Sequence, residues 1–126
     1  MVKAISNNQD TERFELKTLE GAYIVARRLT YGEKLQRRAM VSNFKVRPGD
    51  KKKDFEGEMN FVNEQATLFD FQHCIVDHNL DRDDEGTKLN FSNLNDIRLL
   101  DPRVGEEIDS LLDKLNNFDD EDESGN

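Results

Sequence analysis

The chain has 126 residues, of which 35% are hydrophobic and 36% charged, and its formal net charge is −9. This length allows one domain with a modest core, and the abundance of charge indicates high solubility. The single cysteine, Cys74, excludes an intrachain disulfide and is typical of a reducing compartment. No apolar run approaches the roughly 20 residues that span a bilayer, and residues 1–8 lack the apolar region of a signal peptide. The protein is therefore expected in the cytoplasm.

Charge is unevenly distributed along the chain. Residues 22–53 hold ten basic residues against two acidic ones, whereas residues 54–126 hold 21 acidic residues against five basic ones. Residues 119–126 begin with five consecutive acids that repel one another, which predicts a disordered acidic tail. A flexible N-terminus is expected over residues 1–12 and a single domain over residues 13–118. Such asymmetry bears on partners and self-association more than on fold.

Two extended segments open the domain. Residues 13–19 and residues 22–29 each have the two-residue pattern of an extended chain, in which successive side chains lie on opposite sides. Glu20 and Gly21 lie between the two segments and are compatible with a tight turn. The arrangement predicts a β-hairpin.

The segment after the hairpin carries a helix-start signal. Thr30 and Glu33 have the spacing of a capping box, in which the hydroxyl and the carboxylate satisfy each other's exposed backbone amides. A helix is therefore predicted over residues 31–42, with Arg37 and Arg38 beside its inward face. The side chains expected to face inward are Tyr31, Leu35 and either Ala39 or Met40.

The middle of the chain breaks this pattern. Residues 44–54 combine turn chemistry with three consecutive lysines, which predicts a mobile basic loop. Residues 55–61 alternate between apolar and polar side chains, as in a strand buried on one side. Asn63 can then cap a second helix over residues 64–80. Its predicted apolar sector comprises Leu68, Phe69, Phe71, Gln72, Ile75 and Val76.

A short acidic segment, residues 81–87, invites comparison with a calcium-binding loop. The spacing Asp81-x-Asp83-x-Glu85-Gly86 reproduces the start of an EF-hand loop. The bidentate glutamate of that motif belongs at the twelfth position, which Ser92 occupies here. A solvated acidic turn closed by the glycine is therefore favoured over a metal site.

The last part of the domain is predicted to be helical. Ser92 can cap a short helical segment, and Asp101 with Pro102 forms a strong start signal for a longer helix over residues 101–118. The apolar stripe of this last helix consists of Val104, Ile108, Leu111, Leu112 and Leu115. The whole order of elements predicts an α+β fold, with a small antiparallel sheet of the hairpin and one further strand packed against three to four helices.

Few residues of the sequence are candidates for catalysis or for metal binding. His73, Cys74 and His78 fall on the predicted second helix, and the last two share a face, but a closed zinc site needs four ligands and no further partner has suitable spacing. A buried cysteine with two half-exposed histidines is the favoured interpretation. The sequence also lacks a phosphate-binding glycine loop and a nucleophile elbow. We therefore assign no catalytic, metal or cofactor residue and expect a protein that is not an enzyme.

Residues 27–53 carry most of the positive charge and could grip phosphates, with Tyr31 and Phe44 available to stack on bases. The carboxylates elsewhere in the chain would repel a polyanion. A solvated basic segment, or one that meets an acidic partner, is favoured over nucleic-acid binding.

Two stretches together resemble a known family. They are Ala-Arg-Arg-Leu-Thr-Tyr-Gly-Glu-Lys-Leu-Gln-Arg-Arg at residues 26–38 and Leu-Asp-Pro-Arg-Val-Gly-Glu-Glu-Ile-Asp at residues 100–109. In layout, most of residues 13–118 is similar to the small tail assembly chaperones of long-tailed bacteriophages. The resemblance implies an α+β protein that coats the apolar, largely helical tape-measure protein and recruits tail-tube subunits. It also implies that a longer product can arise by ribosomal frameshifting.

A chaperone of this kind needs an apolar face, and the last helix is the candidate. The candidate partner-binding residues are Val104, Ile108, Leu111, Leu112 and Leu115, together with Arg37 and Arg38. The alternative is that this stripe belongs to the core. The opposite charges of the two parts of the chain favour a homo-oligomer. Two other classes stay open: an acidic inhibitor from a mobile genetic element that imitates DNA, and a small nucleic-acid-binding module.

Overall fold

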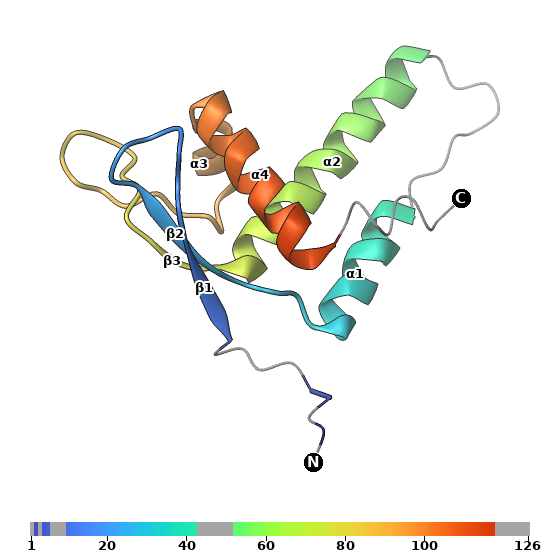
Figure 1. The fold of residues 1–126 in the computed structure, drawn as a ribbon. Helices are drawn as coiled ribbons and strands as arrows, with labels where there is room; N and C mark the ends of the chain where they lie inside the picture. Colours follow the sequence, from blue (N-terminus) through green and yellow to red (C-terminus); the bar gives the residue numbers. More distant parts are fainter. Residues whose placement is uncertain (1, 3, 6–9, 43–51, 118–126) are drawn as a thin grey trace.

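The computed structural model describes residues 2, 4–5, 10–42 and 52–117, with only the backbone described for residues 52–56 and 58. Within this part of the chain, three strands form one antiparallel sheet in the order β1-β2-β3, accompanied by four helices (Figure 1). The α+β class is confirmed. The elements are β1 (Thr11–Glu15), β2 (Tyr23–Arg27), α1 (Tyr31–Ser42), α2 (Lys52–Cys74), β3 (Ile75–His78), α3 (Leu94–Arg98) and α4 (Pro102–Asn116).

The predicted hairpin is present, although its first strand begins at Thr11, inside the predicted flexible N-terminus, and ends at Glu15 rather than at residue 19. Strands β1 and β2 pair in antiparallel register from Thr11 opposite Arg27 to Glu15 opposite Tyr23. Gly21 adopts φ +80° in the turn, a conformation that favours glycine because a Cβ atom would be strained there. Alternate side chains of β2 are buried, so the predicted two-residue period of this strand holds.

The third strand is not the one predicted. Residues 55–61 were expected to form it, but they belong to α2, which also runs through Asn63 without a cap. The strand is β3, within the segment predicted as helix, and it pairs with β2 through Ile24 opposite His78 and Ala26 opposite Ile75. Residues 55–61 form their backbone hydrogen bonds within α2, whereas β3 pairs with the second side of β2, whose buried face lies in the core.

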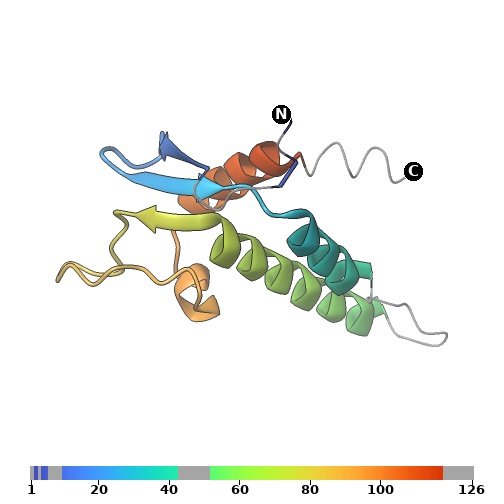
Figure 2. The same ribbon diagram turned by 90° about the horizontal axis from the view of Figure 1, so that it is seen from below.

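The core lies between the sheet, the C-terminal half of α2 and α4. Helix α4 crosses α2 in Figure 1, and Figure 2 shows α4 and α3 on different sides of the line formed by α2 and β3. The buried hydrophobic cluster draws on all of these regions. It includes Leu16, Ala22, Ile24, Ala26, Leu29, Phe71, Cys74, Ile75, Leu80, Leu89, Phe91, Val104, Ile108 and Leu112.

Helix α4 follows its predicted boundaries closely. The Asp101 carboxylate accepts a hydrogen bond from the Arg103 amide at 2.9 Å, and Pro102 is the first helical residue. Asn117 ends the helix at φ 59°, where its own amide closes on the last-turn carbonyls. The short α3 is also present, although its N-cap is Asn93 rather than the predicted Ser92.

A single carboxylate fastens the hairpin to α4. Glu107 accepts hydrogen bonds from the backbone amides of Lys17 at 2.7 Å and Thr18 at 3.0 Å, and from the Thr18 hydroxyl at 2.6 Å. These donors belong to the segment between β1 and β2, about 90 residues earlier in the chain. Hydrogen bonds of this kind, with a charged acceptor, fix the sheet's position against the helix.

Candidate partner-binding surface

The stripe of α4, expected as the partner-binding surface, lies largely inside the protein. Val104, Ile108 and Leu112 are only 6%, 0% and 1% exposed. Leu111 and Leu115 are half-buried and pack against the same cluster. The prediction that Val104, Ile108 and Leu112 bind a partner is therefore wrong, because the sheet and α2 cover them and they belong to the core. Each buried aliphatic side chain stabilises the fold by about 1.5–3 kcal/mol.

Helix α1 is turned the opposite way from the prediction. None of its twelve residues, all of which the structure describes, is buried. Tyr31 and Leu35, expected to face inward, are 67% and 45% exposed, and Ala39 is exposed as well. Of the predicted inward side chains, only Met40 is half-buried. The side of α1 that meets the domain is instead formed by charged residues.

The first of these charged contacts joins α1 to the end of β2. Arg27 donates two hydrogen bonds of 2.9 Å to the Glu33 carboxylate, one to each oxygen. Glu33 also completes the predicted capping box, since it accepts from the Thr30 amide at 2.9 Å and its own amide donates to the Thr30 hydroxyl at 3.2 Å. The Arg27 hydrogen bonds, helped by the Thr30 amide and opposed by burial, lower the pKa of Glu33 to about 2.

The second charged contact joins α1 to α2. Arg37 donates from Nε to both carboxylate oxygens of Asp70, at 2.8 and 3.1 Å, and Asp70 is only 3% exposed. Burial raises the pKa of Asp70 even though the Arg37 guanidinium opposes the rise. Burial also raises the pKa of Asp109, on α4, whose charge Arg37 partly offsets. Arg37, a candidate partner-binding residue, is thus committed to the fold.

The third contact joins α1 to the end of α4. The Lys34 ammonium donates to the Asn116 carbonyl oxygen at 2.7 Å. The Asn116 side chain, which is 1% exposed, accepts from the Leu29 amide at 2.8 Å and donates to the Leu112 carbonyl at 2.9 Å. It also contacts the Cys74 sulfur at 3.6 Å. The oxygen and the nitrogen of this buried Asn116 side chain are both hydrogen-bonded. Because one of these bonds holds Leu29, Asn116 fixes the position at which α1 begins.

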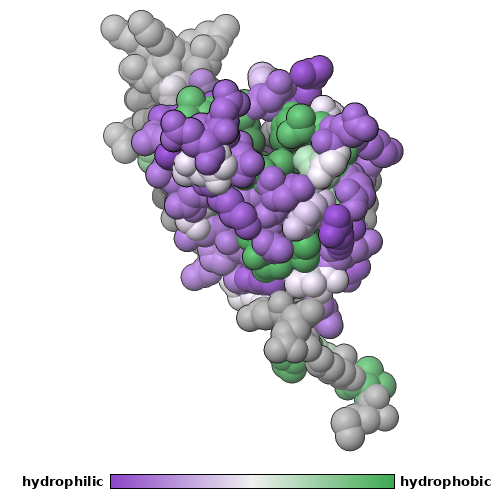
Figure 3. Space-filling model, turned by 90° about the vertical axis from the view of Figure 1, so that its left-hand side faces the viewer, coloured by the Kyte–Doolittle hydropathy of each residue, from purple (hydrophilic) through white to green (hydrophobic). Residues whose placement is uncertain are grey.

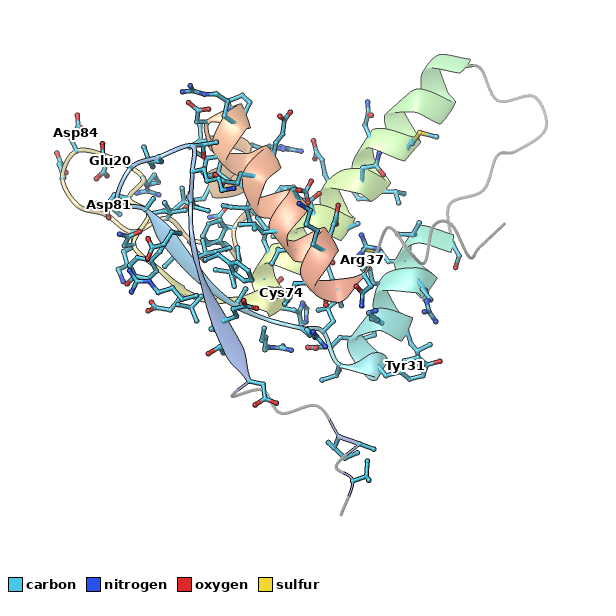
Figure 4. The ribbon with its side chains drawn as sticks, viewed as in Figure 1. Glu20, Tyr31, Arg37, Cys74, Asp81 and Asp84 are labelled. Carbon is cyan, nitrogen blue, oxygen red and sulfur yellow. The ribbon has the colours of Figure 1, made fainter. Side chains whose placement is uncertain are left out.

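The outer side of α1 is left apolar as a result. Tyr31 and Leu35 lie there one turn apart, Val41 near the end of the helix is also exposed, and the Arg38 guanidinium lies 6.0 Å from the centre of the Tyr31 ring. Figure 4 shows Tyr31 at the outer end of α1, whereas Arg37 lies where α1 approaches the end of α4. Arg38, the other basic candidate residue, is therefore placed on the exposed side.

Helix α1 contacts the C-terminal half of α2 through Arg37 and Asp70, and α1 and the N-terminal half of α2 both lie away from the sheet (Figures 1 and 2). We call these two segments the arm. Of the ten large hydrophobic side chains that the described residues expose, five are on the arm. These five, the arm residues, are Tyr31, Leu35, Val41, Met59 and Phe61, and Phe61 is 63% exposed. The sheet end of the molecule, by contrast, is mostly hydrophilic with small separate apolar patches (Figure 3).

The residues considered for metal binding make other contacts. The Asp83 carboxylate accepts from the amides of Glu85 and Thr87, both at 3.0 Å, so it organises its own loop. The loop closes through a bridge between Asp81 and Lys88, and Gly86 takes φ +85°. Over the described residues, no group of three or more His, Cys, Asp or Glu side chains is placed to hold a metal ion.

The histidines and the cysteine are each engaged separately. The His73 ring stacks on Phe69 at 4.1 Å between centroids, and its Nδ1 lies 2.8 Å from the Phe69 carbonyl oxygen. Cys74 is fully buried, and burial raises the pKa of its thiol to about 12. His78 lies on β3 rather than on α2, where its Nδ1 accepts from the Leu80 amide at 3.0 Å. The low thiolate content of Cys74 makes it a poor nucleophile.

Two surface hollows of about 170 and 310 Å³ flank the corner between α3 and α4. Leu100 and Asp101 contribute to both, and the neighbouring Leu99 is 72% exposed. Neither hollow is lined by a histidine, cysteine or serine that could act as a nucleophile.

The sequence matches no protein-family model, no curated protein and no solved structure. Within the described part of the chain, none of the helices combines the length and the apolar character needed to cross a membrane. The fold and surface describe a small α+β protein with a helical arm that displays apolar side chains.

Proposed function

We propose that this protein is a non-enzymatic tail assembly chaperone of a long-tailed bacteriophage. It binds the tape-measure protein in the cytoplasm of the host cell and recruits tail-tube subunits. The observation that supports this function best is the orientation of α1, an amphipathic helix that turns charged residues toward the domain and apolar ones toward solvent. Exposed apolar side chains concentrated on one projecting element are typical of protein-binding surfaces.

The arm suits a helical, apolar partner. A partner helix can lay its apolar face against neighbouring helices, with anchor side chains one turn apart on each. Tyr31 and Leu35 are one turn apart on α1, and both expose close to half or more of their area. Arg38 beside Tyr31 supplies a charged border that keeps the free protein soluble.

The acidic-inhibitor alternative has less support. An imitation of DNA needs rows of carboxylates that face solvent, but several acids of this chain are used inside the fold. Asp70 and Asp96 are 3% and 4% exposed, and Asp96 accepts from the Asn90 amide at 2.9 Å. Glu107 is bound to the hairpin. These contacts weigh against a continuous charged face.

The test is co-expression of the full chain with the tape-measure protein encoded beside its gene, followed by measurement of soluble complex and affinity. The double variant Leu35→Asp/Phe61→Asp should fold normally but weaken binding at least tenfold, because a charge in an apolar contact removes well over 1.4 kcal/mol. Leu99→Asp, which adds a charge to an exposed leucine away from the arm, is the control. Binding that survives the double variant, or a wild-type chain that leaves the tape-measure protein insoluble, would refute the proposal.

A further inference from the structure

Strand β1 forms one edge of the sheet. Over the described residues it pairs with β2 alone, because the strand order is β1-β2-β3. Four of its five residues are exposed, and Phe14 is half-buried against the core. An edge strand presents backbone groups to which a further strand can bond. The second side of β1 is therefore a candidate interaction surface.

The hydrogen bonds of the hairpin determine which backbone groups of β1 are left for another strand. The Leu16 amide donates to the carbonyl oxygen of Ala22, the residue opposite it, at 2.9 Å. Hydrogen-bonded pairs alternate with non-bonded pairs along an antiparallel ladder, so the amide and carbonyl of Phe14 also face β2. Those of Arg13 and Glu15 point away from β2, toward the open side.

The side chains at the centre of β1 are complementary to their own reverse. Arg13, Phe14 and Glu15 follow one another in the sequence. When a second β1 runs antiparallel with the two Phe14 residues opposite each other, each Arg13 lies opposite the Glu15 of the other copy. Opposite charges and aromatic pairs directly across two strands both stabilise a sheet. The side chains of Arg13 and Glu15 are 57% and 67% exposed, so a second copy can reach them.

Other two-fold registers place like charges opposite one another. An axis at Arg13 sets two guanidinium groups face to face, whereas an axis at Glu12 or at Glu15 does the same with two carboxylates. An axis between residues is excluded, because it sets outward backbone groups opposite inward ones. Among the registers centred on residues 12–15, the one at Phe14 is therefore the only one without repulsion between directly opposed charges.

We propose that β1 pairs with β1 of a second copy about a two-fold axis at Phe14, so that two three-stranded sheets join into one. Arg13 and Glu15 of opposite copies then exchange backbone hydrogen bonds on both sides of the axis. The two Phe14 rings, each at the border of its own core, become partners across the axis. The pairing uses no arm residue, so it is independent of the proposed function.

Amide hydrogen exchange of the wild-type chain tests the pairing. The amides of Arg13 and Glu15 should exchange roughly fivefold more slowly at about 1 mM protein than at about 10 µM, because they gain acceptors in the pair. The Phe14 amide already faces β2 and is the internal control. Exchange at Arg13 and Glu15 that does not depend on concentration overturns the proposal. So does protection confined to β3, which would place the contact at the other edge.

A charge exchange distinguishes a second copy from any other occupant of this edge. Arg13→Glu opposes carboxylates on both sides of the axis and Glu15→Arg opposes guanidinium groups, so each variant alone should lose the concentration-dependent protection. Both sites are exposed, so the fold should persist. In an equimolar mixture, every opposed pair again joins a carboxylate to a guanidinium, and protection should return. Single variants that keep the protection, or a mixture that does not recover it, contradict the two-fold pairing.

An intermolecular disulfide tests the register. Phe14→Cys should cross-link two copies in air, since opposed residues of a non-hydrogen-bonded pair have Cα atoms about 4.5 Å apart. Glu12→Cys, on the same side of the strand, is the matched control, because its two copies would lie about 14 Å apart. Cys74 does not compete, since it is 0% exposed and burial raises the pKa of its thiol to about 12. Faster cross-linking of Glu12→Cys than of Phe14→Cys would refute this register.

Discussion

Helices α1 and α4 are both amphipathic, but α4 buries its apolar side whereas α1 exposes its apolar side. Helix α4 buries Ile108 and Leu112 at 0% and 1% exposure, whereas α1 leaves Leu35 at 45% and Tyr31 at 67%. The difference lies in what each helix meets. Helix α4 covers a sheet and a helix that both present apolar side chains, while α1 meets Arg27, Asp70 and the end of α4, which present charges and a carbonyl oxygen. Amphipathic character thus specifies two faces without deciding which one is buried.

The strongest test of this difference places the same charge on the apolar side of α4 and on the apolar side of α1. Leu112→Asp should unfold the protein or destabilise it by about 4 kcal/mol or more, since an unpaired carboxylate would be buried in the core. Leu35→Asp should change the free energy of unfolding by no more than about 0.5 kcal/mol. Urea denaturation followed by circular dichroism measures both. Similar losses in the two variants would mean that α1 also buries its apolar side.

The charged face of α1 can be tested by removing one partner of a buried pair. Arg37→Met should destabilise the fold by about 2–3 kcal/mol at pH 7, because Asp70 would stay buried without its guanidinium. The pKa of Asp70 is already raised by burial and should rise further in the variant. A carboxyl whose pKa is raised by folding favours the native state when protonated, so the variant should regain stability as the pH falls through that raised pKa. Arg98→Met, which affects an exposed ion pair with Glu64, is the control and should have little effect.

The contact between the two helices depends on one amide. Asn116→Ala should destabilise the fold by about 2 kcal/mol, because the buried Leu29 amide would lose its acceptor. Ser110→Ala, at an exposed position of the same helix, is the matched control. Thermal melts of both variants give the difference. If Asn116→Ala matches its control, water has replaced the lost hydrogen bond and α1 does not depend on this residue.

The last prediction concerns self-association, which we expect to change with the smallest effect on stability. We expect the protein to self-associate through the arm, with basic and acidic regions of different copies in attraction. Sedimentation should then show a dimer or larger species whose population falls as salt rises, because exposed ion pairs are screened. Leu35→Ser/Phe61→Ser should reduce the population while leaving the melting temperature within about 2 °C. A salt-independent monomer would contradict this expectation.

Several elements could be predicted from sequence because their signals are local. The capping box of Thr30 and Glu33 located the start of α1, and Asp101 with Pro102 located the start of α4. The hairpin followed from alternating side chains around Gly21. Each signal depends on atoms within a few residues, so no knowledge of the rest of the fold was needed.

Tertiary structure decided the rest. Residues 75–78 form a strand because β2 offers them hydrogen-bond partners, whereas residues 55–61, which alternate in the same way as a strand, are part of α2. The orientation of α1 depends on Arg27, Asp70 and Asn116, which lie up to 82 residues from their partners on α1. Glu33 and Arg37 are four residues apart and therefore share one side of that helix, but the positions of their partners arise only when the sheet, α2 and α4 pack together. The orientation of α1 therefore follows from polar contacts with other elements, which the periodicity of a single helix does not encode.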